Sequence, residues 1–149
     1  MVKQVARDLV ELVDTTADML RALDQETART KPGSDKWSIQ EILGHLLDSA
    51  FNNHQRFVRA QQVDRLEFPK YEQDTWIALQ GYNDMPWLEL IELWRLANRH
   101  VARVVERVPA EQLGTMCEIE PYEPATLEFL IEDYLDHHRH HLRQIDRQR

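Results

Sequence analysis

Seven histidines occur in this chain of 149 residues, and four of them lie within residues 137–141. This segment continues an apolar pattern of helical period that runs from Leu127 to Ile145, so we expect a helix there and not a flexible tail. His137 and His141 are four residues apart, which stacks two imidazoles on one helix face, one turn apart. This spacing allows one helix to offer two nitrogen ligands to a single metal ion.

The other histidines are predicted to have different roles. On a helix, His138 falls near the centre of the inward-facing arc and is predicted to be a core residue, while His140 points away from it. The pair His138 and His141 is a poorer metal half-site than His137 and His141. His54 and His100 are predicted to be surface residues.

A catalytic metal site normally needs a third protein ligand, and an earlier segment offers a candidate. A polar stripe flanks the apolar arc of the helix expected from Ser38 to about Gln61; its members are His45, Ser49, Asn52 and Arg56. Burial of such a stripe is costly unless each group is paired or binds something. A histidine at the border of an apolar arc is more often a hydrogen-bonded, partly exposed residue. His45 therefore joins the pair only if the two helices are neighbours.

These residues lie on four long stretches of helical period, which predict an all-α, up-down four-helix bundle. The stretches are residues 2–23, 38–61, about 83–108, and 126 almost to the end. Ser38 and Glu41 form a capping-box pattern. A long crossover, residues 65–83, includes a short helix near 71–79, and residues 114–124 are irregular or locally extended. We expect negligible β-structure and one domain over residues 1–149.

Composition excludes several classes of function. The chain has 26 acidic and 18 basic residues, a net charge of −8, which argues against a nucleic-acid or anionic-membrane partner. It has no signal-peptide or membrane-span pattern, and we expect a soluble, cytoplasmic protein. No hydrolase elbow or phosphate-binding glycine loop is present. Glu118 and Glu120 beside Cys117 should raise the pKa of its thiol. Asp48 and Glu41 are predicted on the exposed side of His45, where either could orient it.

Three blocks of sequence together resemble a known family. Residues 36–49 match the pattern W-S-x-x-E-x-x-x-H-L-x-D-S and are followed by Asn52 and Arg56. Residues 71–76 fit Y-x-x-x-x-W, and residues 137–145 contain H-x-x-x-H. These blocks, in this order, resemble the DinB/YfiT-like superfamily of metal-dependent enzymes. The resemblance covers residues 36–145.

The resemblance implies a four-helix bundle that binds a divalent metal ion, zinc or nickel, through His45, His137 and His141. It implies a homodimer that acts on a small-molecule substrate, either by hydrolysis or by transfer of a low-molecular-weight thiol such as bacillithiol or mycothiol. Asn52, Arg56 and Tyr71 are candidate substrate contacts. The alternative is a non-enzymatic metal-binding, interaction or stress-response bundle. Members of this branch often have further histidines at positions where this chain has other residues, namely Gly44, Ala50 and Gln144.

Overall fold

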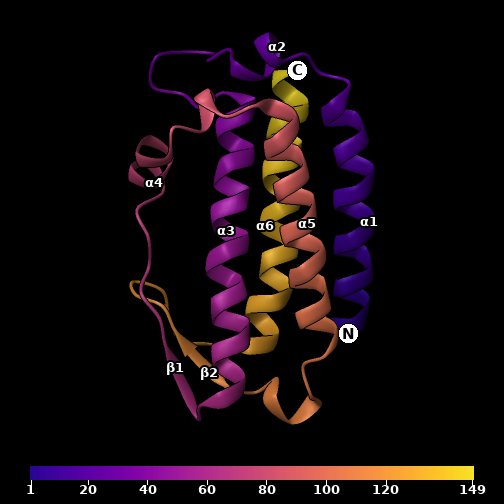
Figure 1. Cartoon of the computed structure of the whole chain (residues 1–149). Helices are drawn as coiled ribbons and strands as arrows, with labels where there is room; N and C mark the ends of the chain where they lie inside the picture. Colours follow the sequence, from indigo (N-terminus) through magenta and orange to yellow (C-terminus); the bar gives the residue numbers. More distant parts are fainter.

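Four long helices form the body of the computed structural model, which describes residues 1–149 (Figure 1). They are α1 (Val2–Arg21), α3 (Ile39–Arg59), α5 (Trp87–Glu106) and α6 (Leu127–Gln148). Both α1 and α3 pack against α5 and α6, so α1 lies diagonally opposite α3. The predicted four-helix bundle is confirmed. None of its helices combines the length and the apolar character needed to cross a bilayer.

The helix starts follow the capping signals in the sequence. The Ser38 hydroxyl accepts a hydrogen bond from the Glu41 amide, and the Glu41 carboxylate accepts one from the Ser38 amide, which confirms the predicted capping box. The Thr126 hydroxyl accepts from the Phe129 amide at the start of α6. Pro86 directly precedes α5. These caps fix where α3 and α6 begin, and therefore which way their histidines face.

The crossover between α3 and α5 runs along the outside of the bundle and returns the chain to the end where α3 began (Figure 1). As a result α3 and α5 run in the same direction. Its elements are η1 (Ala60–Gln62), β1 (Arg65–Glu67), α4 (Gln73–Gln80) and η2 (Tyr82–Asp84). Gly81 ends α4 with a φ of 59°, a left-handed conformation that glycine adopts without strain. A short helix α2 (Gln25–Arg29) links α1 to α3 at the same end.

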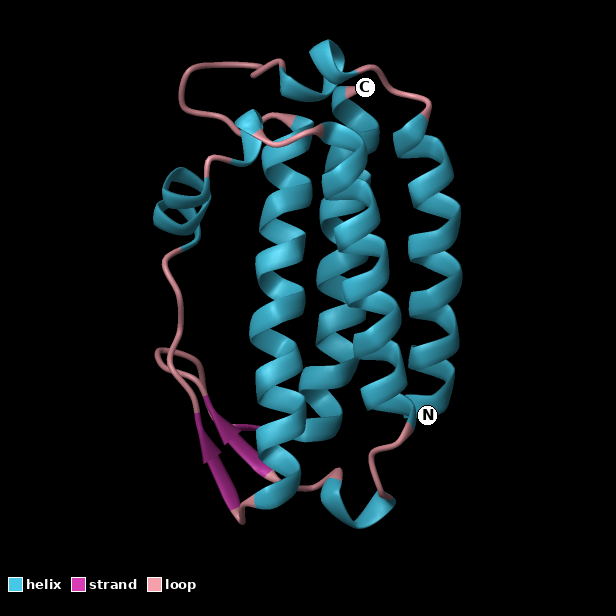
Figure 2. Ribbon diagram, in the orientation of Figure 1, coloured by secondary structure: helices cyan, strands magenta, loops and turns pink.

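A small sheet lies beside the opposite end of α3 (Figure 2). After η3 (Ala110–Gln112), strand β2 (Met116–Glu118) pairs in parallel with β1 and antiparallel with β3 (Ala125–Thr126). Cys117 is the centre of the sheet, opposite Leu66 on one side and Ala125 on the other. Strand content is as small as expected, but residues 65–67 were not predicted to be extended. Their pairing depends on a partner segment about fifty residues away in sequence.

The crossover is fastened to α3 by Tyr82. Its ring lies so close to Gly44 that a Cβ atom at position 44 would collide with it. The Tyr82 hydroxyl donates to Asp48 Oδ1 at 2.6 Å, and Gln40 Nε2 donates to the Tyr82 carbonyl at 2.6 Å. Gly44 is thus required for close approach of the two segments, and a histidine there would displace the crossover.

Candidate metal centre

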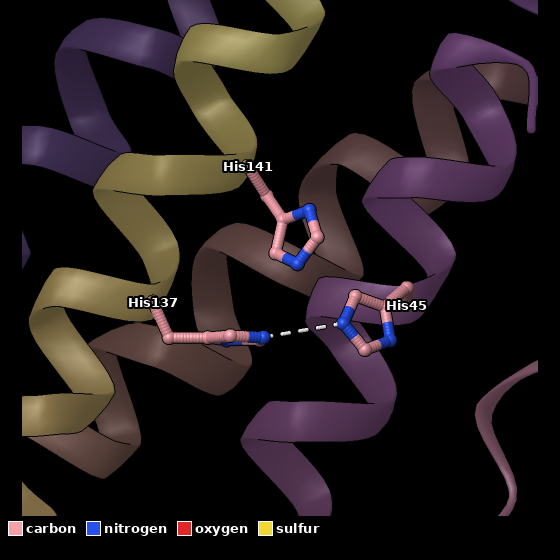
Figure 3. A group of neighbouring side chains, drawn as sticks. All are labelled: His45, His137 and His141. Atoms are coloured by element: carbon pink, nitrogen blue, oxygen red, sulfur yellow. Dashed lines mark hydrogen bonds between the residues drawn. The ribbon is translucent and has the colours of Figure 1, made fainter.

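His45 of α3 and His137 and His141 of α6 face one another inside the bundle (Figure 3). One ring nitrogen from each residue lies within 4.8 Å of the other two. The Nε2 atoms of His45 and His137 are 3.3 Å apart. Two nitrogens bound to one tetrahedral zinc ion are also about 3.3 Å apart, given Zn–N bonds of about 2.0–2.1 Å. The spacing of this histidine triad (His45, His137 and His141) suits a single metal ion.

Burial keeps the imidazoles of the triad neutral. Burial and, to a smaller extent, the neighbouring histidines lower the pKa of His45 to about 3 and that of His137 to about 4. The pKa of His141 is also lowered by burial, although its hydrogen bond to Gln144 acts in the other direction. A neutral imidazole has a free lone pair, which is the form that binds a metal. At neutral pH the donor set is therefore ready for a cation and would not repel it.

Two neighbours orient the triad. His141 Nδ1 lies 2.9 Å from Gln144 Oε1, which can only accept, so Nδ1 carries the proton and Nε2 keeps its lone pair. The Trp37 ring packs on His45 with a centroid distance of 5.0 Å. His45 is completely buried, where the sequence alone favoured partial exposure. Coverage by Trp37 and α6, both outside its own helix, explains the difference.

The remaining histidines lie outside the triad. His138 is completely buried, as predicted, and its Nε2 accepts a hydrogen bond from Trp94 Nε1 at 3.3 Å. His140 and His100 are exposed, in agreement with their predicted surface positions. His54 is half-buried, with its ring 5.2 Å from that of His100.

A cavity of about 900 Å³ opens beside the triad, and His137 forms part of its wall. The walls come from α3, α6, the crossover and the β2–β3 segment. Ser49, Asn53, Cys117 and Tyr134 are the buried polar or polarisable residues that line it. This volume lies near the upper end of the range for small-molecule pockets.

Two of the three residues predicted to contact substrate lie at the cavity. Arg56 and Tyr71 line the cavity, but Asn52 does not. The Asn52 amide instead donates to the Asp48 carbonyl, one turn earlier on α3. The next residue, Asn53, lines the cavity in its place. Adjacent helical residues point about 100° apart, and the cavity lies to one side of the predicted polar stripe, toward Ser49 and Asn53.

Asp48 differs most from its prediction. It was expected on the exposed side of α3 but is only 1% exposed, because the crossover covers it. Tyr82 donates to its Oδ1 at 2.6 Å and Gln80 Nε2 does so at 2.8 Å. Burial raises the pKa of this carboxyl, although both hydrogen bonds oppose the shift. Asp48 therefore anchors the crossover and has no hydrogen bond to His45; Glu41 remains in its capping role.

Cys117 has the raised pKa predicted for it, but from a different cause. Its thiol is buried in the central strand, and burial raises the pKa while nearby Arg56 lowers it. The acidic neighbours Glu118 and Glu120 were the expected cause. A residue at the edge of a cavity was not predictable here, because the sheet that presents Cys117 forms between distant segments.

The bundle and the histidine triad define a helical protein whose donor set suits a divalent metal ion, and comparison with known proteins agrees. The sequence model of the DinB superfamily matches residues 8–145, so the chain belongs to that superfamily. A protein of Oceanobacillus iheyensis described as a "putative metal-dependent hydrolase" is 29% identical over 91 residues. That match covers 60% of this chain and 51% of the relative, so the chain spans about half the length of the curated relative it matches.

The fold also matches a solved structure. YfiT from Bacillus subtilis superimposes with a TM-score of 0.83 over 99% of this chain and 83% of that one, at 18% sequence identity. It is described as "a probable metal-dependent hydrolase with an unusual four-helix bundle topology". At this identity the likeness establishes the fold. The predicted membership of the DinB/YfiT-like superfamily is confirmed.

Proposed function

We propose that this protein is a metal-dependent hydrolase in which His45, His137 and His141 bind one divalent ion. The observation that carries the proposal is the convergence of three neutral imidazoles from two helices at the wall of a large cavity. The descriptions of the Oceanobacillus iheyensis and Bacillus subtilis proteins support the same class of activity. Imidazole donors suit zinc and nickel, and we propose one of these two.

Within this proposal, a divalent ion supplies Lewis acidity that lowers the pKa of a water or thiol it coordinates. The chain's own residues hold and orient the donors. Gln144 fixes the tautomer of His141, and the Trp37 ring packs on His45. The cavity beside His137 admits the substrate.

An enzyme and a structural metal protein differ in the fourth ligand. Structural zinc sites are closed by four protein ligands, whereas catalytic sites keep a position open. The group formed by His45, His137 and His141 contains no further histidine, cysteine or carboxylate. This favours the catalytic alternative over a non-enzymatic metal-binding or interaction bundle.

Elemental analysis of gently purified protein tests the proposal directly. We expect about one zinc or nickel ion per chain, and loss of that ion in the His141→Ala variant. His140→Ala is the matched control, because His140 is adjacent, exposed and outside the triad. Unchanged metal content in His141→Ala would refute the ligand assignment. Hydrolysis of model esters and amides should stop when a chelator removes the metal. Hydrolysis that continues after the metal has been removed would refute the proposed chemistry.

A second candidate activity is transfer of a low-molecular-weight thiol to an electrophile, and the cavity favours it. A hydrolase needs room for one organic substrate and water, whereas about 900 Å³ accommodates a thiol and an electrophile together. Turnover of a model electrophile with and without bacillithiol distinguishes the two. Equal rates would exclude the transferase. A homodimer, a small-molecule substrate and a cytoplasmic location, with no nucleic-acid or membrane partner, complete the proposal.

A further inference from the structure

Arg56 carries a positive charge at the cavity that nothing in the chain neutralises. It forms none of the ion pairs in the structure. Its Nε is buried without a hydrogen-bond partner, and its single hydrogen bond is a long one, 3.5 Å, from Nη1 to Asn53 Oδ1. A half-buried guanidinium without an acidic partner loses hydration that no ion pair replaces. An anion from outside the chain would supply the missing partner.

The surroundings of Arg56 hold its guanidinium in place for such a ligand. The guanidinium carbon lies 5.3 Å from the centre of the Phe68 ring, a cation–π contact that supports one face. Phe68 belongs to the crossover and Arg56 to α3, so two separate segments set the position of the charge. Ser49, Asn53 and Tyr71 add hydroxyl and amide groups to the same wall. The planar fork of arginine matches the two oxygens of a carboxylate.

The charges around the cavity argue for a ligand with one negative charge. Four exposed carboxylate residues line the cavity, and Lys70 is the only other basic residue there; the carboxylates are Glu72, Asp74, Glu123 and Asp133. A multiply charged anion such as a phosphate monoester would be repelled by them. A monocarboxylate meets less repulsion and still pairs with Arg56.

The position of Arg56 along α3 indicates an elongated ligand. Arg56 follows His45 by eleven residues, which is about 16 Å along the helix axis. On α6, the wall extends from Phe129 to His137, about 12 Å. The cavity therefore runs along both helices from the triad toward the sheet. A ligand that pairs with Arg56 and also reaches His137 must therefore be elongated along the bundle.

We propose that Arg56 binds the carboxylate of a small organic monocarboxylate, whose opposite end lies at the histidine triad. The anion-binding role of Arg56 stands on the cavity alone. The placement of the opposite end of the ligand at the histidine triad rests on the proposed function. The inference thus narrows the substrate class to elongated carboxylic acids and carboxylate-bearing thiols.

Titrations of the full-length, EDTA-treated, ¹⁵N-labelled protein followed by NMR test this proposal, with three probes that share a phenyl ring. The probes are 4-phenylbutyrate, the neutral 4-phenylbutanamide and 3-phenylpropylphosphonate, which carries between one and two negative charges near pH 7.5. We expect shift changes at Ser49, Asn53 and Cys117, and at least tenfold tighter binding of the carboxylate than of the amide. The phosphonate should bind more weakly than the carboxylate.

Variants of Arg56 decide whether that preference comes from the guanidinium. Arg56→Gln should reduce carboxylate binding to the level of the amide, and Arg56→Lys should retain part of it. Arg59→Gln is the control, because Arg59 is exposed on the same helix, bonded to Gln55 and absent from the cavity wall. Equal binding of carboxylate and amide, or the same loss in Arg59→Gln, overturns the proposal; tighter phosphonate binding overturns the choice of a carboxylate. The titration contains no metal, so its failure would leave the metal-content test of the proposed function unaffected.

Discussion

His137 and His138 are adjacent in sequence and belong to two different regions of the molecule. His137 points toward α3, where it meets His45 and lines the cavity. His138 points toward α5, where Trp94 donates to its ring and the two rings stack with centroids 6.2 Å apart. Burial lowers the pKa of both imidazoles, to about 4 and about 3.

The difference between these regions lies in what each imidazole faces and not in its protonation. The Nε2 of His138 already accepts a hydrogen bond from tryptophan, so its lone pair is engaged within the protein core. The Nε2 of His137 faces two more imidazoles and a cavity. A lowered histidine pKa therefore does not identify a metal ligand by itself. The partners of the ring separate a binding histidine from a packing histidine.

Exchange of each histidine for alanine should have the largest effects, on metal affinity at His137 and on the free energy of unfolding at His138. We expect His137→Ala to weaken metal binding by at least a hundredfold, with little change in the stability of the metal-free protein. His138→Ala should keep the metal and lower the free energy of unfolding by about 2–4 kcal/mol, since it leaves a cavity and removes the acceptor for Trp94. Metal competition titrations and urea denaturation in EDTA measure the two quantities. Equal loss of metal in both variants would contradict the separation of the two regions.

Acidification should destabilise the metal-free protein through these lowered pKa values. An unfolded histidine binds its proton near pH 6.5, whereas folded His45, His137 and His138 do so near pH 3 to 4. Between pH 6.5 and about 4 the unfolded state thus holds more protons, so the free energy of unfolding falls as pH falls. Fully buried His138 accounts for up to about 1.4 kcal/mol of the decrease in the free energy of unfolding per pH unit in that window.

Urea denaturation in EDTA at pH 7, 6 and 5 measures this dependence. His138→Phe keeps an aromatic ring at the position and removes one titrating group, so its stability should decline less steeply with acid than that of the wild type. Parallel curves for the two proteins would show that His138 titrates normally in the folded state.

Replacement of Gln144 should have a smaller effect on metal binding by the triad. Gln144→Leu removes the acceptor of the His141 Nδ1 proton, and we expect metal affinity to fall about tenfold. Gln55→Leu is the control, because Gln55 is exposed on α3 and accepts a hydrogen bond from Arg59, with no bond to the triad or to Trp37. Competition with a chromophoric chelator measures both affinities. No difference between the two variants would argue against tautomer control by Gln144.

The histidine pair outside the triad should show the smallest effect. His54→Ala removes a half-buried ring that lies next to His100 and outside the cavity lining. We expect unchanged metal content and a change in unfolding free energy within about 0.5 kcal/mol. Loss of metal in this variant would show that binding extends beyond the triad.

Much of the fold was predictable because its signals are local. Helical period, the capping box at Ser38 and the cap at Thr126 each depend on residues within about four positions of one another. The same short range explains why the spacing of His137 and His141 could be recognised as a metal half-site. The crossover was predicted as a long connection, but its strand was not, because a strand of three residues needs a partner.

Four long helices, the starting points of α3 and α6, and the pairing of two histidines on α6 could be predicted from the sequence, whereas α5 begins about four residues later than expected. Only the tertiary structure decided that His45 completes the triad, that Asp48 is buried beneath Tyr82, and that Asn53 takes the place expected for Asn52. The physical reason is the same in each case. Burial and coordination depend on side chains from segments far away in the chain. The packing of the helices determines which of these side chains come into contact.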